Sequence, residues 1–123
     1  MRIITGKYKG RKLISPRDSS IRPATDLVKG SIFNSLQSRL SLLDARVLDL
    51  FAGSGNLGLE ALSRGAAAVT FVDDSPGSLD VIEENARNLD CLDQCTLICD
   101  DAMGFIAREG GEFELLFADP PYA

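Results

Sequence analysis

From residue 46 onward, short apolar runs alternate with segments whose apolar residues recur every three or four positions. The apolar runs predict four strands, over residues 46–51, 69–72, 96–99 and 114–118. The segments between them predict helices over about 57–64, along 79–89 and around 103–106. Strands alternating with helices predict an α/β fold whose sheet is parallel and whose crossovers are right-handed.

The pattern before residue 46 is different. Residues 2–5 and 11–15 are short and β-prone, and the segment 6–10 between them predicts a small hairpin with a cationic tip. Two prolines in 16–25 indicate a loop. A helix over about 27–40, capped by Asp26, would present an apolar face formed by Val28, Ile32, Phe33, Leu36 and Leu40. Two parts are therefore expected: a basic hairpin and loop over 1–25, and a partial Rossmann-like domain over 26–123.

The sequence ends at residue 123, soon after the fourth predicted strand. If the first strand is central, the fourth lies beside it and its outer side has no partner. An open apolar edge invites association, so we expect either a sheet that is truncated at this point or one completed by self-association.

Charge is distributed unevenly along the chain, whose net charge is −5. Residues 1–29 hold eight basic and two acidic side chains, a net charge of +6, whereas the remainder carries −11. This basic arm is suited to a polyanion such as RNA, with Lys7, Lys9, Arg11, Lys12 and Arg22 as candidate contacts. The alternative is an arm that folds back on the acidic body.

Composition excludes several classes of chemistry. The chain has no histidine, which excludes histidine bases, histidine metal ligands and Ser-His-Asp catalysis. Its three cysteines, at positions 91, 95 and 99, lack the spacing of a zinc or iron–sulfur site. We therefore expect no metal and interpret them as buried apolar residues and a loop thiol. No stretch resembles a transmembrane helix or a signal peptide, so a cytoplasmic location is expected.

A glycine-rich loop follows the first predicted strand and predicts a nucleoside cofactor site. Gly53 and Gly55 would let the backbone adopt positive φ and approach a ligand closely, and the next helix would turn its N–H groups toward it. Asp49 is suited to a ligand ammonium group, and Asp73, at the end of the second strand, to ribose hydroxyls. Either Asp100 or Asp101 could accept from an adenine amine or cap a helix. The candidate cofactor residues are Asp49, Phe51, Ala52, Gly53, Ser54, Gly55, Asp73 and Asp101.

The tetrapeptide Asp119, Pro120, Pro121, Tyr122 follows the fourth predicted strand and forms the candidate catalytic site. Consecutive prolines give a rigid loop whose carbonyls can face a ligand. The Asp119 side chain and the Pro120 carbonyl would accept hydrogen bonds from an aromatic amine and turn its lone pair toward a methyl donor. Tyr122 would stack on an extruded or single-stranded base.

These motifs carry a family resemblance over essentially the whole chain. The segments are Arg2-Ile3-Ile4 with Gly6, Lys9-Gly10-Arg11 with Leu13, Arg22-Pro23, Phe33-Asn34, Asp49 with Phe51-Ala52-Gly53-Ser54-Gly55, Leu57 to Ala66, and Asp119 to Tyr122. The chain resembles the RsmD-like methyltransferases, which modify a guanine exocyclic amine of bacterial small-subunit ribosomal RNA. The resemblance implies a Rossmann-like class I methyltransferase sheet of seven strands, S-adenosylmethionine as donor and ribosomal RNA or the small subunit as partner. It also matches Asp73 to the ribose-binding acid and Asp101 to the adenine-side acid.

Departures from the family pattern and two alternatives remain. Ala24 stands where the family usually has threonine, and Leu27-Val28-Lys29-Gly30 where it has Arg-Val-Arg-Glu. An adenine-amine methyltransferase of DNA or RNA would share both motifs. A half-domain that holds a cofactor or RNA without turnover would account for the absent C-terminal strands.

Overall fold

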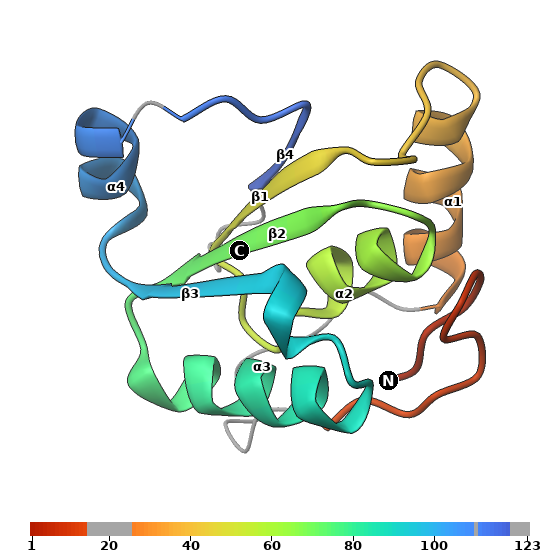
Figure 1. The fold of residues 1–123 in the computed structure, drawn as a ribbon, viewed down its shortest axis with the longest axis horizontal. Helices are drawn as coiled ribbons and strands as arrows, with labels where there is room; N and C mark the ends of the chain where they lie inside the picture. The colour runs from red at the N-terminus through yellow and green to blue at the C-terminus, as the bar shows by residue number, and fades with distance from the viewer. Residues whose placement is uncertain (15–25, 110, 119–123) are drawn as a thin grey trace.

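Four parallel strands form the sheet of the computed structural model, which describes residues 1–14, 26–109 and 111–118 (Figure 1). The strand order is β3-β2-β1-β4, so the first strand is central and the fourth lies beside it, as predicted. All three pairings are parallel. The strands are β1 (Arg46–Leu50), β2 (Ala68–Asp73), β3 (Cys95–Cys99) and β4 (Leu115–Ala118). The predicted α/β fold with a parallel sheet is confirmed.

Helices cover both faces of this sheet, because its central strand alternates its side chains between two apolar layers. Val47 faces the larger core together with the helices α1 to α3, whereas Leu48 and Leu50 face a smaller core with α4. Figure 1 shows α4 set apart from the other helices. The helices are α1 (Asp26–Gln37), α2 (Asn56–Ser63), α3 (Pro76–Asn88) and α4 (Ala102–Glu109), with a short 3₁₀ helix, η1 (Leu92–Gln94), that the sequence did not predict.

Helix α1 packs with most of the predicted face, because Phe33 is buried and Ile32, Leu36 and Leu40 lie partly buried against the same core cluster. Lys29 and Phe33 are its buried residues, whereas Val28 is 49% exposed. The helix also ends at Gln37, so Leu40 lies beyond it. The prediction counted apolar residues alone and so missed Lys29, which is as fully buried as Phe33.

Substitution by alanine is expected to have opposite effects on stability at two helical glycines. A Cβ at Gly30 in α1 would meet no described atom within 4 Å, whereas one at Gly58 in α2 would lie 2.3 Å from Cε1 of Phe71. We therefore expect Gly30→Ala to raise the free energy of unfolding by about 1 kcal/mol, and Gly58→Ala to lower it by about 1–3 kcal/mol. Urea unfolding of the two variants measures both effects, and equal shifts would contradict the packing of α2 on β2.

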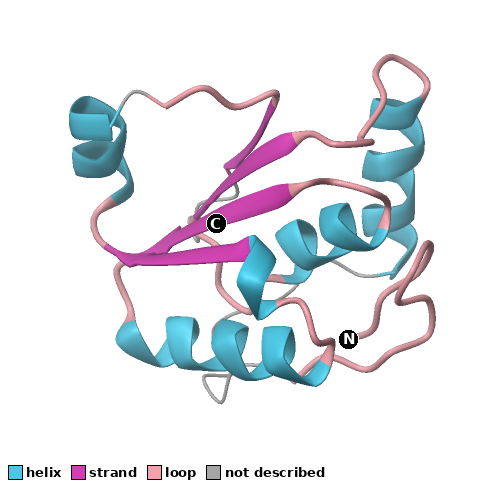
Figure 2. Cartoon of the chain, in the orientation of Figure 1, coloured by secondary structure: helices cyan, strands magenta, loops and turns pink. Residues whose placement is uncertain are grey.

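Residues 1–14, which we call the N-terminal strap, form a loop without regular strands that lies against the rest of the chain (Figure 2). The two sides of the predicted hairpin do run antiparallel, with the Ile3 N–H donating to the Arg11 carbonyl and the Leu13 N–H to the Met1 carbonyl, but they form one bridge, Arg2 to Lys12, and not the regular strands expected over 2–5 and 11–15. Ile3, Tyr8 and Leu13 are buried in the same core cluster as the sheet. The division at residue 25 stays a prediction, since residues 15–25 lie outside the described part.

The cysteines occupy three environments. Cys91 is buried, Cys95 is partly buried and Cys99 is exposed, and none forms a disulfide. Cys99 ends β3, within the strand predicted over 96–99, whereas Cys91 lies in the connection between α3 and η1. The hydrogen bond with Cys91, followed by burial, raises the pKa of the Cys95 thiol, which keeps it protonated and unreactive. Among the described residues, no helix combines the length and apolar character needed to cross a bilayer.

Candidate functional site

The loops that follow the strands meet at one edge of the sheet, because the carboxyl ends of parallel strands point the same way. In Figure 1 this edge lies on the left, where α4 leaves β3. The glycine-rich loop follows β1, Asp73 ends β2, and Asp100 and Asp101 follow β3. The tetrapeptide Asp119 to Tyr122 and Arg22 lie outside the described residues, so their roles stay predictions.

The glycine-rich loop has a left-handed backbone at three positions. Gly53 has φ of 60° and Gly55 of 80°, and Phe51 also has φ of 56°. Positive φ at the two glycines was expected, but Phe51 was predicted to continue the strand, which ends at Leu50. A non-glycine residue in this region stores about 1–3 kcal/mol of strain. The chain therefore turns sharply at Phe51, before the glycines open the loop.

Asp49 connects the end of β1 to the helix that follows this loop. It is 2% exposed, and its Oδ2 accepts a hydrogen bond from the Gly58 backbone N–H at 3.1 Å. The carboxylate thus fixes the first turn of α2 relative to β1. Its predicted contact with a cofactor ammonium group stays a prediction.

Asp73 connects the end of β2 to the same loop. Its Oδ2 accepts from the Gly53 N–H at 2.9 Å, and its Oδ1 accepts from the Ser75 N–H at 2.9 Å. Both bonds fix the orientation of the carboxylate, which is half-buried. A carboxylate has about four lone-pair sites, so this arrangement leaves acceptor capacity that suits ribose hydroxyls.

Asp101 is the residue of its pair that caps a helix. Its Oδ2 accepts from the Gly104 N–H at 2.9 Å, while Oδ1 of Asp100 accepts from the Asp101 N–H at 2.8 Å. Asp100 also pairs with Arg108. Asp101 is exposed and adjoins the end of β3, so it lies at the same sheet edge as Asp73. Together these acceptors and the glycine loop suit a nucleoside cofactor with ribose hydroxyls and an adenine amine.

The strap carries the candidate polyanion contacts on its outer side. Lys7, Lys9, Arg11 and Lys12 are all exposed, although Nη2 of Arg11 donates to the Asn88 carbonyl at 2.5 Å. The backbone of the strap folds back on the body while these side chains stay at the surface. The two alternatives for the arm are therefore compatible.

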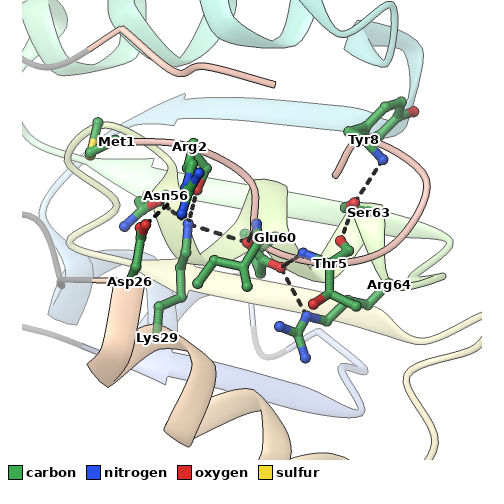
Figure 3. Close-up of polar contacts among 12 residues, drawn as sticks. Met1, Arg2, Thr5, Tyr8, Asp26, Lys29, Asn56, Glu60, Ser63 and Arg64 are labelled. Carbon is green, nitrogen blue, oxygen red and sulfur yellow. Dashed lines mark hydrogen bonds and ion pairs between the residues drawn. The ribbon is translucent and has the colours of Figure 1, made fainter. Parts of the chain in front are cut away.

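A buried charge cluster that the sequence analysis missed lies beneath the strap (Figure 3). Glu60 of α2 is fully buried and forms ion pairs with Nζ of Lys29 at 3.2 Å and Nε of Arg64 at 2.9 Å. Its carboxylate also accepts from the backbone N–H groups of Ile4 at 2.9 Å and Thr5 at 3.1 Å. Burial lowers the pKa of Lys29 and the neighbouring Glu60 opposes this effect.

Ser63 extends this attachment by one turn of α2. Its hydroxyl donates to the Thr5 carbonyl at 2.6 Å and accepts from the Tyr8 N–H at 2.9 Å. The signal in the sequence was a glutamate and a serine on a helix whose remaining residues are mostly apolar or small. A charged side chain is usually solvated, so that signal alone does not predict a buried one.

Comparison with known proteins places the chain among methyltransferases. A model of the family described as conserved hypothetical protein 95 matches residues 1–123. The Escherichia coli K12 protein named ribosomal RNA small subunit methyltransferase D is 40% identical over 99% of this chain, which spans 60% of that relative's length. The solved structure of yhhF from Escherichia coli has a TM-score of 0.87 and 38% identity, covering 99% of this chain and 64% of that one. A SAM-dependent methyltransferase from Agrobacterium tumefaciens has a TM-score of 0.67 and 29% identity, covering 85% and 34%.

Proposed function

This chain belongs to the family described as conserved hypothetical protein 95, and on that premise we propose that it transfers a methyl group from S-adenosylmethionine to the exocyclic amine of a guanine in small-subunit ribosomal RNA. The RsmD-like resemblance is confirmed by this match together with the 40% identity to ribosomal RNA small subunit methyltransferase D, but the substrate and activity of the whole protein are part of the proposal. One observation carries it: the glycine loop, Asp73 and Asp101 meet at a single sheet edge, in a chain 40% identical to a ribosomal RNA methyltransferase.

The residues at this edge have distinct roles in the proposal. S-adenosylmethionine would supply the methyl group as a sulfonium donor. Asp73 would accept the ribose hydroxyls and Asp101 the adenine amine, with the loop from Asp49 to Gly55 shaping the backbone around the ligand. The N-terminus of α2 directly follows Gly55, and the positive end of the helix would favour the ligand's negative groups.

The tetrapeptide after β4 would hold the base. Asp119 and the Pro120 carbonyl would accept the amine's two N–H groups, Pro121 would keep the loop rigid, and Tyr122 would stack on the ring. No strong base is needed before transfer, because the methylated amine can lose its proton afterwards. The acceleration would come from alignment of the two reactants and exclusion of water.

Mapping the methylated base tests this function. The full-length protein is incubated with labelled S-adenosylmethionine and small subunits from cells that lack the modification, with already methylated subunits as the control. We expect label on one guanine of the unmodified subunits alone. Label on an adenine would favour an adenine-amine methyltransferase, and binding of the cofactor without incorporation would favour a non-catalytic half-domain.

The strap provides a second testable part of the proposal, its contact with RNA. Replacing Lys7, Lys9 and Lys12 together by glutamine removes three exposed cations of the strap. We expect RNA affinity to fall and the slope of log affinity against log salt to decrease by about 0.7–0.9 for each lost phosphate contact. Arg39→Gln, an exposed cation after α1, is the matched control. An unchanged slope in the triple variant would remove the strap from the RNA interface.

A further inference from the structure

Three contacts join the N-terminal strap to the glycine-rich loop. Oγ of Ser54 donates to the Met1 sulfur at 3.4 Å. The Asn85 amide of α3 donates to the carbonyls of Ile14 at 3.1 Å and Ser54 at 3.3 Å, and its Oδ1 accepts from the Ile14 N–H at 2.7 Å. The two ends of the strap therefore meet the same residue of the loop, one directly and one through Asn85.

The third contact passes through Lys29. Its ammonium group donates to the Arg2 carbonyl at 2.6 Å and to Oδ1 of Asn56 at 2.6 Å, and it lies 3.2 Å from Oε1 of Glu60. Asn56 is the first residue of α2, directly after Gly55. Figure 3 shows the Lys29 side chain rising from α1 to meet the strap and α2 at one point.

Each acceptor of this ammonium belongs to a different part of the site. The Arg2 carbonyl belongs to the strap, Asn56 to the junction of loop and helix, and Glu60 also receives the strap's Ile4 and Thr5 N–H groups. The lysine side chain is 1% exposed, so water cannot replace a lost partner without opening the structure. Displacement of the strap would remove the Arg2 carbonyl as an acceptor of the ammonium group. The Lys29 side chain would then shift, and its hydrogen bond to Asn56 would shift with it.

We propose that Lys29 is a positioning residue that couples the docking of the N-terminal strap to the geometry of the cofactor-binding loop. This inference rests on the proposed function, because it takes the loop from Phe51 to Gly55 as the site for S-adenosylmethionine. Coupling between two sites is reciprocal. A ligand bound at the loop must therefore hold the strap more tightly, and a loosened strap must weaken the ligand.

The test combines ligand affinity with amide hydrogen exchange of the strap in Lys29→Met, which keeps the length of the side chain but removes its charge and donors. The probe is S-adenosylhomocysteine, measured by calorimetry on the full-length protein. We expect at least about five-fold weaker binding in the variant. In the unmodified protein the ligand should slow exchange of the Ile4 and Thr5 amides, and in the variant this ligand-dependent protection should disappear.

Matched variants separate this coupling from a general loss of structure. Lys29→Arg restores a cation with several donors and should restore the ligand-dependent protection, whereas Arg39→Met removes an exposed cation and should leave affinity and exchange unchanged. If Lys29→Met does not fold, Asn56→Ala removes the bond from Lys29 to the first residue of α2 and should give the same loss of protection.

The outcomes distinguish this inference from the proposed function. Wild-type affinity and undiminished strap protection in Lys29→Met, or in Asn56→Ala where it is needed, would overturn the coupling while leaving the methyltransferase proposal intact. Failure of the unmodified full-length protein to bind S-adenosylhomocysteine would overturn the proposed function and this inference with it.

Discussion

Replacing Glu60 by alanine is expected to lower the free energy of unfolding by about 3–5 kcal/mol. The carboxylate is the common partner of two buried cations, Lys29 at 3.2 Å and Arg64 at 2.9 Å, and of two backbone N–H groups of the strap. Removing it leaves two uncompensated charges in an environment that excludes water, which costs more than the attraction itself contributes. Urea unfolding followed by circular dichroism measures the change.

Glu83→Ala is the matched control for this prediction. Glu83 pairs with Arg87 on α3 at 3.6 Å, with side chains 46% and 65% exposed, so its removal should change stability by no more than about 1 kcal/mol. A similarly small change in Glu60→Ala would mean that solvent reaches the cluster, and the burial described for Lys29 and Glu60 would be wrong.

The cluster also shows where sequence patterns stop being informative. The sheet could be predicted because its signal is local: each apolar strand is followed by a turn and an amphipathic helix, and a central first strand places the fourth beside it. Glu60 could not be predicted, because its burial depends on the strap, and the Ile4 amide that it accepts from lies 56 positions earlier. Periodicity along α2 contains no information about a segment that packs over it.

Helix α1 and the glycine loop illustrate two further limits. Lys29 occupies the buried stripe of α1 since its ammonium finds three acceptors there, a condition set by other elements of the fold. At the loop, the positive φ of Phe51 has no sequence signal, because glycine is the residue that usually marks such a conformation. By contrast, Asp73 and Asp101 could be placed at one sheet edge because a parallel sheet requires it.

Asp119→Ala is expected to reduce methyl transfer by the full-length protein at least about 100-fold, while the affinity for S-adenosylhomocysteine stays within about two-fold. The register supports this separation of roles: Ala118, the residue before Asp119, pairs with Leu50, the residue before Phe51. Strand β4 therefore ends level with the strand that leads into the glycine-rich loop, and in the proposed function Asp119 orients the amine whereas Asp73 and Asp101 hold the ribose and the adenine. Single-turnover transfer to unmodified small subunits measures the rate, and calorimetry measures the affinity.

Asp80→Ala, an exposed aspartate of α3, is the control for a general effect of charge and should alter neither quantity. The comparison of rate with affinity is decisive, because an aspartate that held the cofactor would lose both together, whereas one that orients the amine contributes only where the nitrogen approaches the methyl group. Unchanged transfer in Asp119→Ala would remove this side chain from the reaction. Parallel loss of affinity and rate would instead reassign Asp119 to the cofactor site and leave the Pro120 carbonyl as the acceptor that orients the base.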